Sequence, residues 1–260
     1  EERHNHLLAS LKQSFGLKKR AGGGSAANSI VAISQFGGKT FYACKVANDE
    51  FGEFYMHDLH AAGVDTRLDQ VRCSSEGKTG KCMVMVTPDA ERTMNTYLGI
   101  TSDFSAAELH YEELKQSNYL YVEGYLVTSD TSRAAVLEAR KVAKQHGVKM
   151  AMTFSDPSMA TYFKTGLVEM LGEGVDVLFC NEEEAFAFTG KTTLQDAIQA
   201  LKPLTQKLVI TLGSDGALVV NAGNEVKIAA QAVKPLDTNG AGDMFAGAFL
   251  YGLPQGLSNA

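Results

Sequence analysis

The feature of this 260-residue chain that most constrains its fold is a regular alternation of strand-like and helix-like segments from residue 106 onward. The strand-like segments are short apolar runs, whereas the helix-like segments repeat apolar residues every three or four positions. Strands that alternate with helices form a mostly parallel sheet covered by helices on both faces. The predicted strands are residues 118–124, 148–154, 175–180, 207–212, 216–221 and 225–231, and the predicted helices are residues 106–115, 131–147, 159–171, 182–190 and 193–204.

The preceding part of the chain contains one departure from this pattern. Alternating runs from Lys81 to Thr87 and from Arg92 to Tyr97 are joined by the turn sequence PDAE, which predicts a β-hairpin. Because the hairpin interrupts the alternation, we expect it to stand off the main sheet as a small β lid around residues 81–97. The other predicted elements here are helices over residues 7–16 and 50–63, a helix after the glycines at 22–24, a strand over 39–46 and an extended edge over 63–72.

Together these patterns predict one α/β domain over residues 1–260, with a three-layer α/β/α, Rossmann-like arrangement and a mostly parallel central sheet. The chain starts in a helix with no strand before it, and it stops soon after its last predicted helix. We therefore expect both termini to be truncated.

Charge and cysteine content exclude several classes of function. The net charge of −6 and the pI near 5.6 argue against a nucleic-acid-binding protein, whose affinity would come from clustered Lys and Arg. The four cysteines, Cys44, Cys73, Cys82 and Cys180, form no CxxC pair, so neither a disulfide framework nor a structural metal is indicated. With no signal sequence or membrane-spanning run, the sequence favours a cytoplasmic protein without a membrane partner.

The stretch DTNGAGD, from Asp237 to Asp243, precedes an apolar, small-residue helix. Gly240 and Gly242 permit close backbone approach, and with Ala241 they leave amide groups uncovered at the start of that helix. Such a helix start is suited to an anion such as phosphate. Asp243 beside it could take a proton from an attacking hydroxyl. The alternative is a turn followed by an N-capping Asp, which needs no ligand.

Other glycine motifs do not support a P-loop or a dinucleotide site. Each of the three GKT sequences lacks the required glycine five residues earlier, where Ile33, Arg72 and Ala185 stand. Gly22, Gly24 and Ala27 satisfy G-x-G-x-x-A, but no strand precedes them, so a dehydrogenase is disfavoured.

Three further segments could bind ligands. In GGGSAAN the bare backbone would admit a polyhydroxylated ligand beside Asn28, although a turn capped by Ser25 or Asn28 explains it equally well. NEEEA, from Asn181, and TLGSDG, from Thr211, both follow predicted strands, at the sheet edge where α/β proteins place their ligands. The acidic helix start also suits the helix dipole, and TLGSDG also suits a hairpin turn.

In this order the segments resemble the ribokinase, or pfkB, family of carbohydrate kinases, and within it the adenosine kinase-like branch. The resemblance covers nearly the whole chain. It is carried by the hairpin and by GGSAAN (23–28), KVANDEFG (45–52), YVEGYLVTS (121–129), NEEE (181–184), TLGSDGA (211–217) and DTNGAGD (237–243).

The resemblance implies a ribokinase-type fold and an enzyme that transfers the γ-phosphoryl group of ATP to a hydroxymethyl group. Asp243 matches the family's catalytic base. Gly240, Ala241 and Gly242 match its anion hole, and Asn181 and Glu184 match the motif that organises Mg²⁺ through water. Thr211, Gly213 and Gly216 match the nucleotide loop, and Gly23, Gly24 and Asn28 match the acceptor loop. Asp237 matches a monovalent-cation site, for K⁺, that many members use.

At this point the sequence leaves the identity of the acceptor molecule open. The adenosine kinase-like phrases favour a nucleoside, whereas fructokinase and ribokinase-type sugar kinases share them. A non-catalytic nucleotide- or sugar-binding protein with the same fold is the alternative from another class. In either case we expect a small-molecule partner and a monomer or homodimer, with the lid excluding water from the reaction.

Overall fold

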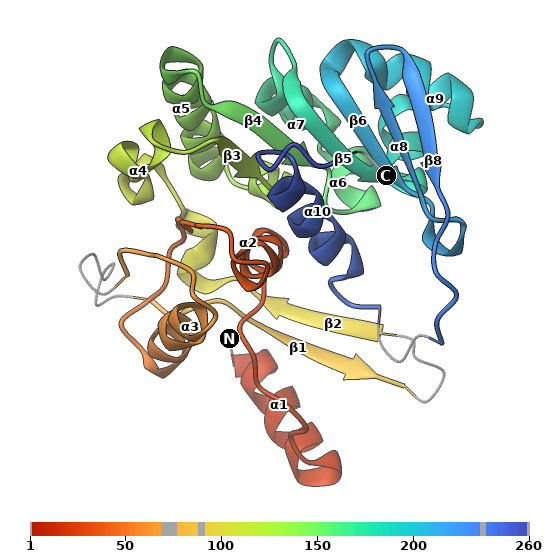
Figure 1. Cartoon of the computed structure of the whole chain (residues 1–260). Coiled ribbons are helices and arrows are strands. Elements are labelled where there is room, and N and C mark those ends of the chain that lie inside the picture. The colour runs from red at the N-terminus through yellow and green to blue at the C-terminus, as the bar shows by residue number, and fades with distance from the viewer. Residues whose placement is uncertain (1, 69–76, 88–91, 235–237, 259–260) are drawn as a thin grey trace.

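The computed structural model describes residues 2–68, 77–87, 92–234 and 238–258. Its main sheet has six strands in the order β3-β4-β5-β6-β7-β8. The first four strands run parallel, and β7 and β8 continue the sheet antiparallel, so the predicted mostly parallel sheet is confirmed (Figure 1). The strands are β3 (Tyr119–Val122), β4 (Lys149–Thr153), β5 (Val175–Asn181), β6 (Thr205–Thr211), β7 (Ala217–Asn221) and β8 (Asn224–Ile228).

Alternate residues of these strands face two separate cores, because side chains along a strand point to opposite faces. On one face Met152, Leu178 and Leu208 pack in a core shared with five helices. On the other face Val177 and Val209 pack against two helices. The five helices are α5 (Asp130–His146), α6 (Pro157–Tyr162), α7 (Lys164–Leu171), α8 (Glu182–Thr189) and α9 (Leu194–Leu201); the two are α2 (Ser25–Gln35) and α10 (Ala241–Gly252). The three-layer prediction is therefore confirmed.

The predicted hairpin forms a separate two-stranded antiparallel sheet, β1 (Lys81–Val86) and β2 (Arg92–Tyr97), with Lys81 opposite Tyr97. Figure 1 shows it set apart from the main sheet, below α2 and α10 in this view. Its position off the main sheet matches the small β lid expected from the sequence. The helix α1 (Glu2–Phe15) reaches it through His4, whose Nδ1 lies 2.9 Å from Oδ1 of Asn95.

The strand predicted over residues 39–46 is wrong. Its backbone forms only an isolated bridge between Phe41 and Asp65, in which Tyr42 N donates to Asp65 O and Asp65 N to Thr40 O. The rest of the segment lacks a partner strand among the described residues, so no ladder extends from the bridge. The helix that follows is α3 (Glu50–Ala61), as predicted.

Two predicted helices are each divided. Residues 106–115 form a 3-10 turn at Ala106–Glu108 and the helix α4 (Tyr111–Lys115), because Ser105 and Glu108 close a capping box on the turn and His110 is extended. Residues 159–171 belong to α6 and α7, with Phe163 (φ −120°, ψ 22°) leaving the helical conformation between them. The remaining 3-10 helices are Gly99–Asp103, Gly124–Thr128, Lys202–Leu204 and Gly213–Asp215.

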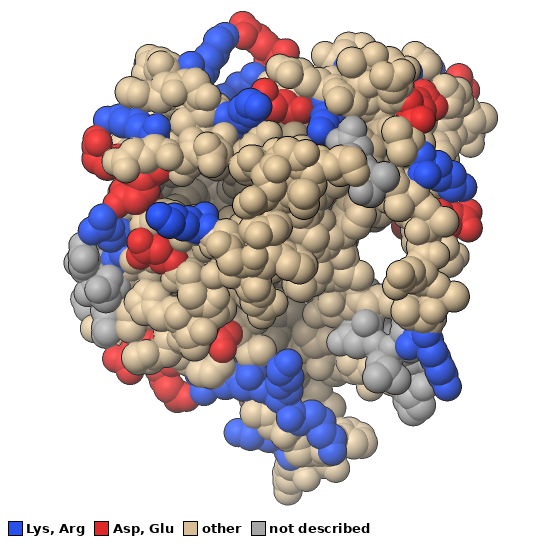
Figure 2. Space-filling view, in the orientation of Figure 1, with Lys and Arg blue, Asp and Glu red and all other residues tan. Residues whose placement is uncertain are grey.

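Acidic and basic side chains are interspersed around the rim of the face in Figure 2, and basic ones gather at its lower end, over α1 and the segment after it. The centre of this face is largely uncharged, which matches the small and apolar residues of α2 and α10. No helix in the described part of the chain has both the length and the apolar character required to cross a membrane.

Candidate active site

The carboxyl ends of β3 to β6 carry the polar residues of the candidate site. Glu123 follows β3, Asp156 lies shortly after β4, Asn181 ends β5 and Thr211 ends β6. Asn181 and Thr211 are direct neighbours in the parallel pairing of β5 with β6. The parallel register therefore brings two of the segments singled out in the sequence to one edge of the sheet.

Asp243 lies in the first turn of α10, where the backbone enters the helix through Gly240 in the left-handed conformation (φ 73°). Ser25 Oγ donates to Asp243 Oδ1 and Asn28 Nδ2 donates to Asp243 Oδ2, each over 2.8 Å. Both donors belong to α2, so the carboxylate is held by the start of the second helix on this face. The amide of Ala241 donates to Thr238 O over 3.2 Å and so closes the turn that begins the helix.

Burial raises the pKa of Asp243 above its ordinary value, and the hydrogen bonds from Asn28 and Ser25 oppose that rise. Burial disfavours the charged form, whereas donors to a carboxylate favour it. The side chain is therefore a carboxylate in a fixed orientation whose basicity exceeds that of an exposed Asp. Those properties are the ones a general base for a hydroxyl proton requires.

The start of α2 is held by Glu123, a residue to which the sequence analysis assigned no role. Gly24 is the N-cap (φ 115°), with no side-chain capping bond, so the interpretation of this loop as a turn capped by Ser25 or Asn28 is wrong. Instead Ala26 N donates to Glu123 Oε2 over 2.7 Å. Burial raises the pKa of Glu123, as does the charge of Asp243, while the bond from Ala26 opposes the rise.

Asn181 and Glu184 form a reciprocal capping box at the start of α8. Glu184 N donates to Asn181 Oδ1 over 2.7 Å, and Asn181 N and Nδ2 donate to the two carboxylate oxygens, each over 3.0 Å. Burial, together with the charges of Asp156 and Asp243, raises the pKa of Glu184 to about 7, while the hydrogen bond from Asn181 N opposes the rise. Three mutually repelling carboxylates thus share one region, where a cation would offset their charge.

This arrangement fits Mg²⁺ held through water. Mg²⁺ prefers oxygen ligands and keeps several of its waters in proteins. Within the described segments, no group of three or more His, Cys, Asp or Glu side chains is placed to chelate a metal ion directly.

The TLGSDG loop connects β6 to β7 as a tight turn closed by Leu212 N donating to Gly216 O over 2.8 Å. Gly213 (φ 58°) has open space where a Cβ would stand, whereas a Cβ on Gly216 would lie 1.9 Å from Ile228 O. Gly213 therefore leaves backbone accessible, and Gly216 allows the loop to approach the end of β8.

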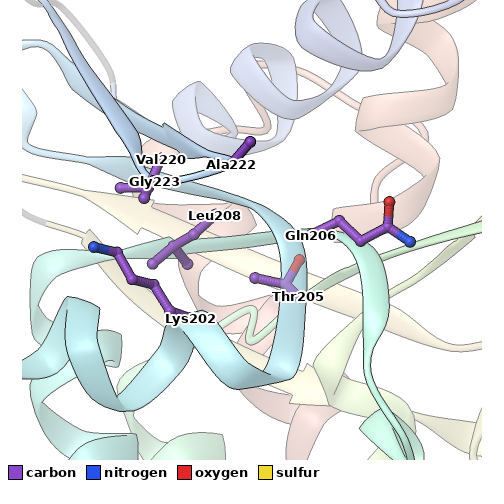
Figure 3. Close-up of a pocket in the computed structure, with 7 residues that line it drawn as sticks. All are labelled: Lys202, Thr205, Gln206, Leu208, Val220, Ala222 and Gly223. Atoms are coloured by element: carbon purple, nitrogen blue, oxygen red, sulfur yellow. The ribbon is translucent and has the colours of Figure 1, made fainter.

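Gly23 and Gly24, predicted to belong to an acceptor loop, lie immediately before α2, so they adjoin the residues that hold Asp243. Asp237 lies outside the described residues. The hollow drawn in Figure 3, about 190 Å³ and lined by residues including Lys202, Thr205 and Gly223, lies at the other end of β6 and contains none of the predicted site residues.

Sequence reasoning missed three residues that the structure brings to the site, namely Ser25 as a donor to Asp243, Glu123 and Asp156. For Glu123 and Asp156 the available signal was their position at or just beyond the carboxyl end of a predicted strand, where parallel sheets place functional residues. For Ser25 no local signal existed, because its partner is 218 positions away in the sequence.

Comparison with known proteins places the chain among sugar and nucleoside kinases. Residues 4–260 match the family described as pfkB family carbohydrate kinase. Adenosine kinase of Saccharomyces cerevisiae is 29% identical over 255 residues, which cover 92% of this chain and 73% of the yeast protein.

Solved structures agree. The adenosine kinase from Sinorhizobium meliloti superposes with a TM-score of 0.90 at 33% identity, covering 97% of this chain and 77% of that one. Fructokinase from Vibrio cholerae O395, solved with fructose, ADP and calcium ion, has a TM-score of 0.75 at 25% identity and covers 88% of this chain and 75% of its own.

Proposed function

The chain belongs to the pfkB family of carbohydrate kinases and is a phosphotransferase acting on a hydroxyl group of a sugar or nucleoside, and on that premise we propose that Asp243 is the base of the transfer. The observation that carries the proposal is the fixing of both Asp243 oxygens by Ser25 and Asn28 at the start of α10. This carboxylate has a defined orientation, a raised pKa and a helix N-terminus beside it.

In the proposed step Asp243 accepts the proton of the acceptor hydroxymethyl group. The acceptor oxygen then bonds to the γ-phosphorus of ATP, and the bond from that phosphorus to the bridging β-phosphate oxygen breaks, releasing ADP. First-turn amides at Gly240 to Gly242 face the charge that develops on the transferred group. Because Ala241 N is bonded to Thr238 O, that turn must reopen for Ala241 to contribute its amide.

For the nucleotide we propose Thr211, Gly213 and Gly216 as the binding loop, and Asn181 and Glu184, with Asp156 nearby, as the group that holds Mg²⁺ through water. When bound, Mg²⁺ neutralises phosphate charge, as phosphoryl transfer requires. We further propose K⁺ at Asp237. We also propose a reducing, cytoplasmic location, because Cys82 and Cys180 are thiols and not members of a disulfide.

For the acceptor we propose a nucleoside bound at Gly23, Gly24 and Asn28. The support is the adenosine kinases found among the relatives in both sequence and structure. A sugar such as fructose is the second candidate, supported by the fructose-bound relative.

A coupled assay of ADP release with adenosine, inosine, ribose, fructose and fructose phosphates, with and without K⁺, would identify the acceptor. In the same assay, Asp243→Asn should reduce turnover by about 10²- to 10⁴-fold while nucleotide affinity, measured by calorimetry, is retained. The matched control is Asp130→Asn at the exposed start of α5, which should behave as wild type. Near-normal turnover of Asp243→Asn would exclude Asp243 as the base, and ligand binding without transfer to any acceptor would favour a non-catalytic binding protein.

A further inference from the structure

Two residues other than glycine have a positive φ in the described part of the chain, and one of them adjoins the candidate site. Ala222 (φ 48°) belongs to the tight turn between β7 and β8, where such a conformation is usual. Ser155 (φ 70°) lies instead between the end of β4 and Asp156. Because a residue with a side chain is strained in this conformation, the surrounding contacts must hold Ser155 in place.

The backbone makes a γ-turn around Ser155. Asp156 N donates to Phe154 O over 2.9 Å, and with the positive φ of Ser155 this bond defines the rare, strained form of that turn. Ser155 N donates to Thr153 Oγ1 over 3.2 Å. Phe154 is buried and stacks on Phe188 of α8, with ring centroids 4.4 Å apart. The strained turn is therefore fixed by the strand before it and by the packing beneath it.

The turn sets the direction of Asp156. As the N-cap of α6, Asp156 accepts at Oδ1 from Ser158 N over 2.7 Å. Burial and the charge of Asp156 both raise the pKa of Tyr125, to about 12, and that of Glu184, to about 7. The carboxylate thus lies close to the side of the site proposed to bind the nucleotide and Mg²⁺.

The hydroxyl of Ser155 holds the other side of the site. Ser155 Oγ accepts from Gly124 N over 2.8 Å, and a Cβ at Gly124 would lie 2.3 Å from Phe154 O, so the two chain segments are in close contact. Gly124 directly follows Glu123, whose Oε2 accepts from Ala26 N at the start of α2. The same start of α2 supplies both donors to the proposed base.

We propose that Ser155 is a positioning residue of the transfer, which fixes the start of α2 and the carboxylate of Asp156 relative to each other. Its hydroxyl holds the backbone beside Glu123, and its γ-turn directs Asp156. Strained residues that their surroundings hold in place occur preferentially at functional sites, where the strain maintains a required geometry. This inference rests on the proposed function and adds to it a residue that joins the acceptor side to the nucleotide side.

Two variants separate the hydroxyl of Ser155 from its strain. Ser155→Ala removes the hydroxyl but keeps a Cβ at positive φ, whereas Ser155→Gly removes the hydroxyl and the strain together. Ser155→Ala should lower kcat/KM for the acceptor by about 10-fold or more, because small displacements of positioned groups slow a reaction steeply. Ser155→Gly should unfold at a higher urea concentration than Ser155→Ala and yet have a lower kcat, because its turn no longer directs Asp156.

This opposition between stability and activity distinguishes positioning from a merely structural role. Kinetic constants equal to those of wild type in both variants would overturn the proposal. A higher kcat in Ser155→Gly than in Ser155→Ala would also overturn it, because activity would then follow stability alone. If Ser155→Ala does not fold, Ser155→Gly, which adopts the turn without strain, is compared with wild type in the same way.

The matched control is Ala222→Gly. Ala222 lines the hollow of Figure 3, at the edge of the sheet opposite the candidate site. The substitution relieves a positive φ there, so it should raise the urea midpoint while kcat and both KM values stay unchanged. A loss of activity equal to that of Ser155→Gly would show that relief of strain anywhere in the sheet impairs the enzyme, and the assignment to Ser155 would fail.

A double-mutant cycle tests the route through Glu123. Glu123→Ala removes the acceptor for Ala26 N and so breaks the link to α2. Adding Ser155→Ala to Glu123→Ala should then lower kcat/KM for the acceptor little further. Effects that multiply would refute this route and the proposal with it. Failure of wild type to phosphorylate any acceptor would instead refute the proposed function, and this inference with it.

Discussion

Asn28 Nδ2 and Asp243 Oδ2 lie 2.8 Å apart, joining the starts of α2 and α10 across 215 positions of sequence. The two helices can approach this closely because Gly247, one turn after Asp243, has no side chain. A Cβ at Gly247 would lie 2.5 Å from Ser29 O and 2.7 Å from the Cβ of Ala32. The orientation of the proposed base therefore depends on how this helix pair packs.

Replacing Asn28 by Asp would remove the donor to Asp243 and place a second carboxylate beside it. Like charges at this distance raise the pKa of the pair, so the acid limb of the pH profile of kcat/KM should move upward by about one unit or more. The sign follows from the role of Asp243, since a base with a higher pKa stays protonated, and inactive, to a higher pH. The measurement is kcat/KM across the acid range.

The matched control for that change is Asn118→Asp, an exposed position before β3. Its profile should coincide with that of wild type. If Asn28→Asp lowers activity equally at every pH, Asn28 acts on acceptor binding alone, and the influence of this contact on Asp243 is refuted.

Replacing Gly247 by Ala should push α10 away from α2. Overpacking of this kind costs about 1–3 kcal/mol of stability, and here it would also separate Asp243 from its donors. We expect a lower midpoint of urea unfolding together with a reduced kcat. Gly252→Ala in the same helix meets only ordinary contacts with Leu257, at 3.4 Å and beyond, and should be neutral or slightly stabilising. Equal stability of the two variants would show that α2 and α10 can accommodate a Cβ at position 247 without moving apart.

The order of strands and helices could be predicted from the sequence because the buried apolar residues of each element recur at the spacing typical of a strand or of a helix. The strand over 175–180 and the helix over 131–147 correspond closely to β5 and α5 for that reason. The break between α6 and α7 could not be predicted, since Phe163 is neither Gly nor Pro and no local signal marks the end of a helix there.

The candidate site was predictable only as separate segments. Asn181 and Glu184 form a local capping box, so their pairing follows from spacing alone. The contacts of Ser25 with Asp243 and of Ala26 with Glu123 join residues 218 and 97 positions apart, and they depend on how helices pack on the sheet. Local patterns carry no information on such distances.

Replacing Glu184 by Gln should stabilise the ligand-free protein at alkaline pH. Burial raises the pKa of this carboxyl to about 7 in the folded state, above its value in the unfolded chain. The group therefore favours folding while it is protonated, and that contribution is lost as the pH rises from the unfolded pKa through about 7. Gln can retain the cap without ionising. We expect a gain of about 1–3 kcal/mol at about pH 8 and little difference at about pH 4.

The measurement for Glu184→Gln is urea unfolding at the two pH values. Glu182→Gln, an exposed residue in the same helical turn, is the control and should give no gain at either pH. A Glu184→Gln variant that is less stable than wild type at alkaline pH would mean that the carboxylate is stabilised by its neighbours rather than destabilised by burial. Whatever its stability, the Glu184→Gln variant should show less Mg²⁺-dependent transfer, because the proposed metal-holding charge is lost.

Gly213 and Gly216 in the proposed nucleotide loop allow the effect of backbone conformation and the effect of steric space to be separated in one experiment. Both glycines have positive φ, 58° and 94°, but only at Gly216 would a Cβ collide with backbone, at 1.9 Å from Ile228 O and 2.7 Å from Ala230 N. Gly213→Ala should therefore cost about 1–2 kcal/mol, the ordinary penalty of a left-handed residue. Gly216→Ala should cost more, because the end of β8 must also move, and this displacement should raise the KM for ATP more than Gly213→Ala does. Urea unfolding and ATP titration of both variants check this order. If the KM for ATP rises more in Gly213→Ala, the exposed backbone at Gly213 itself, rather than the position of the loop, determines nucleotide binding.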